Sequence, residues 1–398
     1  MKWRNIALFI LGLLVAINSF AGVDPRQTDA LNHIPVTVSG KVVIMTLREA
    51  MNYFKVPAVS LAVIENNKLA WTYSTGYLSP SKQQPINNNT LFQAGSLSKP
   101  VAALLAIKLC DQNILPLDKD VNPLLKGWEI TKPAKYKDMP VTLRELVSMS
   151  SGLDTGGYFG YAPGEKLPTL VQLLSGKPPA DNPPVKLIYQ PGSQYYYSGG
   201  GYEVMELLID SVTQSNFTDL AYKEILSPLA MDRSTFVQPL PAKLTDNAVL
   251  ATDQDGHPFD YPWRVNPEHA AAGLWTTPTD LAKFTVAIIK AYQGSPHAII
   301  SRDLAKQVLT QQTNTPYGLG FAVEGAGKKL HFMKMGQNAG YQGWLVGFPI
   351  TGQGAVVMTN SDNGRELAQD IIYSLAKTYR WSTDGKLKDA WMLDPGES

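Results

Sequence analysis

The chain has 398 residues, of which 44% are hydrophobic and 17% charged, so it carries enough apolar material for a large core and no long disordered segment is expected. Its 35 basic and 34 acidic residues are evenly mixed and give a formal net charge of +1, which argues against nucleic acid as a partner. The single cysteine, Cys110, cannot form an internal disulfide and is expected to be a buried structural thiol.

The N-terminus has the pattern of a signal peptide. Lys2 and Arg4 precede an apolar run over residues 6–17, and Ser19-Phe20-Ala21 forms a small-x-small cleavage site. The apolar run is shorter than the roughly 20 residues that a membrane-spanning helix needs. We therefore expect residues 1–21 to be removed on export to a bacterial periplasm or medium, leaving no stable membrane span. The alternative is an uncleaved anchor.

The next predicted elements lead to the first strands. A loose lead-in over residues 22–44 precedes an amphipathic helix over 46–54, which opens with a capping box. Residues 56–77 are apolar and β-branched, and Asn66-Asn67 suits a tight turn between two strands.

Helical segments alternate with Pro- and Gly-containing loops between residues 115 and 260. Amphipathic helices are predicted over 141–153, with Gly152 as its stop, and over 202–214. The remaining predicted elements are a helix, four short strands and a closing helix: 276–292, 317–323, 329–336, 343–349, 354–360 and 366–379.

This order of elements predicts an α+β architecture, an antiparallel sheet flanked by helices with a mostly helical lobe inserted into it. The sheet lobe would comprise residues 45–115 and 260–380, the helical lobe 116–259, and a tail 381–398. We expect a cleft between the two lobes.

The stretch AGSLSKPVAALLAIKL, residues 94–109, carries the first candidate site. Ser96 and Lys99 are three residues apart, so on a helix their side chains share one face. The apolar residues that follow predict a buried helix, and desolvation lowers a lysine's pKa toward the range where it accepts a proton. A serine beside such a lysine is an activated nucleophile. The alternative is that Ser96 only caps the helix and Lys99 reaches solvent.

Two further motifs follow in the order that S-x-x-K hydrolases require. They are Tyr197-Ser198-Gly199, before a predicted helix, and Lys334-Met335-Gly336, on a predicted strand. Taken alone, the tyrosines at 195–197 could be an aromatic packing patch and Lys334 a solvated strand residue. The glycines at 199–201 do not read as a phosphate loop, because no Lys-Ser or Lys-Thr pair follows them.

With these motifs, the chain resembles the serine hydrolases grouped with class C β-lactamases, D-alanyl-D-alanine carboxypeptidases and related esterases. The resemblance covers roughly residues 45–380 and rests on GSLSK, YYYSGGGYEVMELLI, KMGQNAGY and GAVVMTN. It implies a β-lactamase/transpeptidase-like fold and a covalent acyl-enzyme.

The resemblance also implies roles for the matching positions. Ser96 would be the acylated nucleophile, Lys99 its general base or proton relay, and Tyr197 a second proton-transfer group that protonates the leaving group. Lys334 would hold the tyrosine and the substrate's carboxylate electrostatically, and the backbone N–H groups of Ser96 and Gln337 would form the oxyanion hole. Further substrate-side positions are those of the second and third motifs: Ser198, Gly199 and Gly336.

Three departures from the family pattern bear on the substrate. Gly199 stands where the family often has an asparagine that contacts the substrate's amide, and Met335 replaces the threonine of the third motif. Met149 stands where many relatives have histidine. These changes argue against efficient β-lactam or D-Ala-D-Ala recognition and leave the acylation machinery in place.

Other chemistries lack their sequence signals. The five histidines form no metal-binding pairing, and no serine has glycines two residues before and after it, as a G-x-S-x-G hydrolase requires. We therefore expect no metal and no cofactor. The hypothesis is an exported serine hydrolase acting on a small ester, a D-amino-acid peptide derived from peptidoglycan, or weakly on a β-lactam. The alternatives are a sensor module that is acylated without turnover, a structural relative with a dead site, and an acyltransferase; the oligomeric state stays open.

Overall fold

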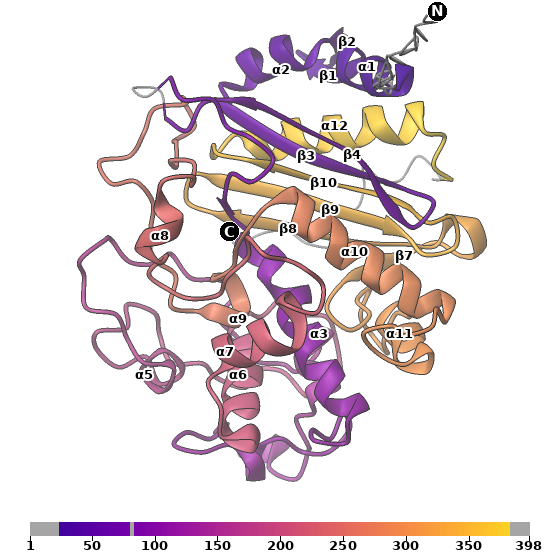
Figure 1. The fold of residues 1–398 in the computed structure, drawn as a ribbon. Coiled ribbons are helices and arrows are strands. Elements are labelled where there is room, and N and C mark those ends of the chain that lie inside the picture. Colours follow the sequence, from indigo (N-terminus) through magenta and orange to yellow (C-terminus); the bar gives the residue numbers. More distant parts are fainter. Residues whose placement is uncertain (1–23, 80–82, 383–398) are drawn as a thin grey trace, which may run out of the picture.

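The computed structural model describes residues 24–79 and 83–382 (Figure 1). The expected signal peptide and residues 383–398 of the expected tail lie outside this range. Within it, no helix combines the length and apolar character needed to cross a membrane.

A six-stranded antiparallel sheet, in the order β4-β3-β10-β9-β8-β7, forms the centre of the molecule. Strand β3 pairs with β10, with Ala62 opposite Val356, so the two ends of the chain build one sheet as predicted. Asn66 and Asn67 have φ of 50° and 61° and make the expected tight turn between β3 and β4. The strands are β3 (Ala58–Glu65), β4 (Lys68–Gly76), β7 (Ala322–Glu324), β8 (His331–Asn338), β9 (Tyr341–Phe348) and β10 (Gln353–Thr359).

Helices cover both faces of the sheet. Helix α12 (Gly364–Thr378) packs against β9 and β10, and α10 (Pro278–Gln293) packs against the opposite face (Figure 1). The outer layer beyond α12 comprises α1 (Pro25–Asn32), β1 (Ile34–Val38), β2 (Lys41–Met45) and α2 (Leu47–Phe54). The expectation of a loose lead-in over 22–44 is therefore wrong for its described part, because Ile34 and Val36 are buried and β1 packs against α12.

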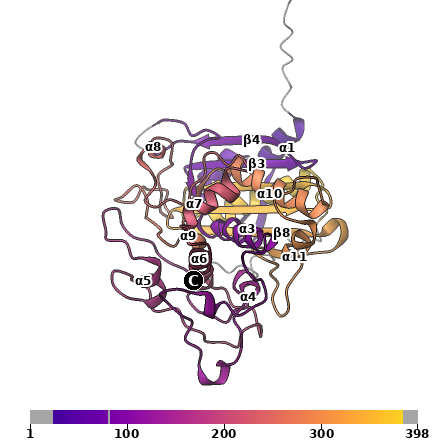
Figure 2. The same cartoon turned by 60° about the horizontal axis from the view of Figure 1, so that its bottom comes forward.

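Helices from the middle of the sequence form the rest of the molecule (Figure 2). Helix α3 (Ser98–Asp111) is buried almost all round, as its continuous apolar sequence predicts, and contacts α6 and α9. The other elements are α4 (Leu143–Val147), α5 (Leu170–Ser175), α6 (Gly199–Thr213), α7 (Phe217–Ala221), α8 (Ala242–Thr245), α9 (His269–Ala272), α11 (Arg302–Val308) and the short strands β5 (Phe92–Gln93) and β6 (Trp275–Thr276).

The helix starts follow the capping residues that the sequence offers. Thr46 with Glu49 and Thr142 with Glu145 both form complete capping boxes. Helix α4 is nonetheless much shorter than the predicted 141–153, and Gly152 is not its stop. Met149 adopts a left-handed φ of 59°, which turns the chain away two residues after the helix ends at Val147.

Candidate active site

The nucleophile candidate lies in a tight turn at the head of α3. Residues Gly95–Leu97 form a 3₁₀ turn, and α3 begins at Ser98. The ammonium nitrogen of Lys99 donates to Ser96 Oγ at 2.9 Å, and both residues are buried. The structure therefore brings together the pair that the spacing predicts. Ser98 is used otherwise: its Oγ accepts the N–H of Leu274 at 3.0 Å.

The second and third motifs converge on the same oxygen. The hydroxyl of Tyr197, just before α6, donates to Ser96 Oγ at 2.8 Å, and Lys334 Nζ, on β8, donates to the Tyr197 hydroxyl at 3.4 Å. Lys334 is 1% exposed, so the alternative of a solvated strand lysine does not hold. Four side chains thus form one continuous hydrogen-bonded group, and they come from the 3₁₀ turn, the first turn of α3, the segment before α6, and β8.

Two buried lysines lie close to one phenol. The nitrogens of Lys99 and Lys334 each lie 5.0 Å from the centre of the Tyr197 ring. Positive charge near a phenol in a dry site favours negative charge on its oxygen. The arrangement can therefore hold a proton-deficient hydroxyl next to Ser96 Oγ.

The backbones of the 3₁₀ turn and β8 touch, and only glycine allows it. Gly95 has a φ of +50°, and a Cβ there would lie 2.5 Å from the backbone nitrogen of Gln337. A Cβ on Gly336 would lie 2.1 Å from the carbonyl oxygen of Ala94. These two glycines place the Gln337 peptide directly beside the turn that carries Ser96.

A family model described as Beta-lactamase matches residues 45–379, which is most of the chain. The chain belongs to this family. Its fold is that of the β-lactamase/transpeptidase group, as the sequence predicted.

Relatives and solved structures add detail to this assignment. The chain is 25% identical over 262 residues to the teichoic acid D-alanine hydrolase of Staphylococcus aureus, covering 66% of this chain and 61% of that relative. The penicillin-binding protein homologue of Pyrococcus abyssi, described as octameric, superposes with a TM-score of 0.70 at 22% identity, over 85% of this chain and 77% of its own. The D-alanine carboxypeptidase AmpC of Burkholderia cenocepacia superposes with a TM-score of 0.66 at 16% identity, over 83% of this chain and 96% of its own. The structural likenesses establish the fold.

The second motif differs from the Beta-lactamase family expectation in geometry as well as sequence. Ser198 is the N-cap of α6: its Oγ accepts the N–H of Gly201 at 2.8 Å and donates to the carbonyl oxygen of Asp154 at 2.8 Å. Its hydroxyl is therefore committed to the backbone and is not available for the substrate contact expected from the sequence. At Gly199, a Cβ would lie 2.9 Å from the carbonyl oxygen of Gly156, so the family's asparagine does not fit here.

The two methionine departures lie next to the motifs. Met149 is buried, and its Sδ accepts the N–H of Ser198 at 3.4 Å while its carbonyl accepts the N–H of Tyr196 at 2.8 Å. This residue therefore fixes the strand-like segment that carries Tyr197. Met335 follows Lys334 on β8, and its Sδ lies 4.0 Å from Nη2 of Arg365.

Sequence reasoning missed a group of buried acidic residues on α6. The sequence predicted an amphipathic helix over 202–214, and the polar side of such a helix usually faces solvent, yet Glu203 and Glu206 are 0% and 3% exposed. Burial, and then the charge of Glu206, raise the pKa of Glu203 well above its usual range. Burial alone would lower the pKa of His269, but the Glu206 carboxylate 2.9 Å from its Nδ1, together with the charges of Glu268 and Asp210, raises it.

No group of three or more His, Cys, Asp or Glu residues in the described part of the chain could hold a metal ion. The Cys110 thiol is half-buried, and desolvation, followed by the charge of Asp118, raises its pKa to about 12. It is therefore a poor nucleophile and metal ligand at neutral pH.

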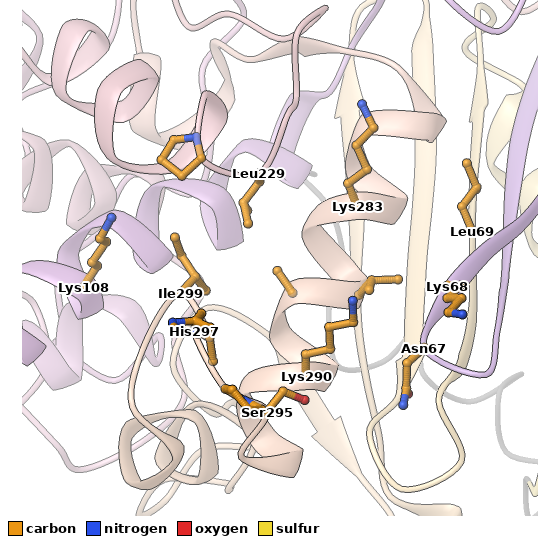
Figure 3. A pocket seen from close by; sticks show the side chains of 15 residues that line it. Asn67, Lys68, Leu69, Lys108, Leu229, Lys283, Lys290, Ser295, His297 and Ile299 are labelled. Atoms are coloured by element: carbon orange, nitrogen blue, oxygen red, sulfur yellow. The ribbon is translucent and has the colours of Figure 1, made fainter.

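A separate cavity of about 660 Å³ is lined by α10, the β3–β4 turn, Lys108 of α3 and the segments 228–229 and 295–299, and by none of the motif residues (Figure 3). Four lysines surround it, but Lys108 is paired with Glu224 at 3.0 Å and Lys283 with Asp280 at 2.9 Å. Half of its cationic groups are thus neutralised within the protein.

Proposed function

We propose that this protein is an exported serine hydrolase that forms a covalent acyl-enzyme on Ser96 with an ester or amide substrate. The observation that carries the proposal is the convergence of Lys99 Nζ at 2.9 Å and the Tyr197 hydroxyl at 2.8 Å on one serine oxygen. These distances are within the reach that proton transfer requires.

The proposed reaction begins when Ser96 Oγ attacks the substrate's carbonyl carbon. Its proton passes to Lys99 if that amine is neutral, or to Tyr197 if that side chain is a phenolate. The two residues act as one coupled group. When the tetrahedral intermediate collapses, Tyr197 returns the proton to the leaving alcohol or amine. Water then attacks the acyl-enzyme with the same group as base, which releases the acid and regenerates Ser96.

We assign the oxyanion hole to the backbone N–H groups of Ser96 and Gln337. The support is the contact between the 3₁₀ turn and β8 at Gly95 and Gly336, which brings these two peptides together without intervening side chains. Fixed backbone dipoles in a dry site stabilise the developing negative charge without reorganising. Lys334, held by the Tyr197 hydroxyl and by the Met335 carbonyl at 3.1 Å, supplies positive charge on the substrate side.

The substrate class that we propose is a D-alanyl ester or amide, or a small ester. One relative is named for teichoic acid D-alanine hydrolysis, and one fold neighbour is a D-alanine carboxypeptidase; the chain spans only about 61% of the length of the first of these. The lack of space for a side chain at Gly199, together with Met335 in place of threonine, removes polar contacts to an amide substrate. Esters are therefore favoured over peptides, with β-lactams as a weak side activity.

A substrate panel tests the proposal. Purified protein is incubated with a p-nitrophenyl ester, a D-alanyl ester, a D-Ala-D-Ala peptide and a chromogenic cephalosporin, and initial rates are measured. We expect turnover of the esters that disappears in Ser96→Ala and persists in Ser98→Ala, a neighbouring buried serine that bonds only the backbone. Stoichiometric acylation without product release would instead support the sensor module, and no reaction with any substrate would contradict the proposal.

A further inference from the structure

The short helix α9 connects all three site-bearing segments. The carbonyl oxygen of Ala271 accepts a hydrogen bond from Lys99 Nζ at 3.0 Å, in addition to the bond that this ammonium makes to Ser96. The carbonyl of Ala272 accepts a hydrogen bond from Nδ2 of Asn338 on β8 at 3.3 Å, and α9 packs against α6. Helix α9 therefore supplies one of the acceptors that hold the Lys99 ammonium beside Ser96.

Two acidic side chains of α6 hold the start of α9. Its cap residue, Glu268, makes no side-chain cap bond, so the first N–H groups of α9 need other acceptors. Glu206 Oε2 accepts the Ala270 N–H at 2.9 Å, and Glu203 Oε1 accepts the Ala271 N–H at 3.1 Å. Glu206 Oε1 also lies 2.9 Å from His269 Nδ1.

Burial of these carboxyl groups lowers the stability of the fold, so we expect the buried glutamates to have a specific role. A polar group buried among apolar neighbours destabilises the fold unless it is bonded, and Glu203 Oε2 has no hydrogen-bond partner. Glu203 and Glu206 lie three residues apart on one face of α6, the helix that starts directly after Tyr197. They therefore couple the helix that follows Tyr197 to the backbone that orients Lys99.

We propose that Glu203 and Glu206 are positioning residues for the reaction, which act through the backbone of α9 to aim the Lys99 ammonium at Ser96. Neither residue touches the reacting atoms. Glu203 holds the peptide N–H of the same residue whose carbonyl binds Lys99, and Glu206 holds the preceding N–H and the His269 ring. The inference rests on the proposed acylation of Ser96.

The test compares Glu203→Met, which removes the acceptor at similar volume, with Glu203→Gln, which keeps an oxygen for the Ala271 N–H. The measurement is the rate constant for acylation by a fluorescent serine-directed phosphonate probe, as a function of probe concentration. Because a misplacement of about 1 Å costs up to about 10²-fold in rate, we expect Glu203→Met to lose roughly tenfold or more at an unchanged half-saturating probe concentration. Glu203→Gln is expected to retain most of the rate.

The control is Ser211→Ala, another buried α6 side chain, which bonds the Lys126 N–H instead of α9. It reports the effect of loosening the helix without altering α9, and its acylation rate should match that of the wild type. If Glu203→Met does not fold, the acylation rate of Glu206→Gln is used to test the proposal instead. Its amide has one acceptor oxygen for two donors on α9, so the same fall in rate is expected.

Three results would overturn the proposal. The first is a wild-type acylation rate in Glu203→Met, or in Glu206→Gln if Glu203→Met does not fold, because α9 would then not need these acceptors. The second is a loss of rate in Glu203→Gln equal to that in Glu203→Met, because the acceptor oxygen would then not be what matters. Failure of the wild-type protein to be labelled at Ser96 would overturn the proposed function, and this inference with it. The first two results would leave the proposed function intact.

Discussion

Replacing Gly336 by alanine tests whether close backbone contact between β8 and the nucleophile turn supports activity. Since a carbon–oxygen contact needs about 3.3 Å and the new Cβ would lie 2.1 Å from the Ala94 carbonyl oxygen, the two backbones must separate by about 1.2 Å. A Cβ there would also lie 2.8 Å from the Leu97 nitrogen, so side-chain rotation cannot relieve the clash.

The separation moves the Gln337 peptide away from Ser96. Loss of one oxyanion donor costs about 10²–10³ in kcat, or about 2.7–4 kcal/mol, in a serine hydrolase where it was removed. We expect kcat of Gly336→Ala for a p-nitrophenyl ester to fall by about 10²-fold, and the free energy of unfolding to fall by about 1–3 kcal/mol from overpacking.

The assay measures initial rates together with thermal unfolding of each variant. Gly156→Ala is the matched control, because a Cβ there has no atom within 4 Å and its φ is not left-handed. It should keep both the activity and the melting temperature of the wild type. A folded Gly336→Ala with wild-type kcat would show that the strand tolerates the displacement, which contradicts the prediction.

Three further predictions follow from single groups. Tyr197→Phe keeps the ring near the two lysines but removes the proton-transfer hydroxyl, so kcat should fall about 10²–10⁴-fold in steady-state assays; a fall below tenfold would argue against its role. Native Cys110, with its pKa raised to about 12 by burial, should resist iodoacetamide at pH 8 and react once the protein is unfolded in guanidinium; rapid reaction of the native thiol would contradict this. Burial, then the charge of Glu206, raises the pKa of Asp210 from 3.8 to about 7. The folded state therefore binds this proton more tightly, and the stability it contributes is lost as pH rises from about 4 to about 7. Asp210→Asn should thus gain stability relative to the wild type over that range in urea titrations, and a constant difference would contradict the assignment.

The sequence predicted the parts of the fold that depend on local chemistry. The capping boxes at Thr46 and Thr142 form as expected, and the Asn66-Asn67 turn has the predicted conformation. Helix lengths were less predictable, since the turn at Met149 is set by the hydrogen bonds of its carbonyl and sulfur to the segment before α6. Such bonds join residues far apart in the sequence and leave no local pattern.

The sequence predicted the part of the site in which a residue's position leaves it few alternative roles. A lysine three residues after a serine, at the head of an apolar helix, indicated a buried pair, and the structure contains it. Glu203 and Glu206 were missed because an amphipathic pattern does not distinguish a face that meets water from one that meets backbone N–H groups. Two glutamates within YEVMELLI, so close after the tyrosine motif, are the signal that could have raised the question.

The most direct test of the account is to locate the acyl group. The protein is trapped with a slowly hydrolysed acylating probe, digested, and the modified peptide is sequenced by mass spectrometry. We expect one adduct per chain, on Ser96, absent from Ser96→Ala and retained in Ser198→Ala, whose hydroxyl caps α6 and bonds the Asp154 carbonyl. An adduct on another residue, or labelling that survives in Ser96→Ala and disappears in Ser198→Ala, would contradict it.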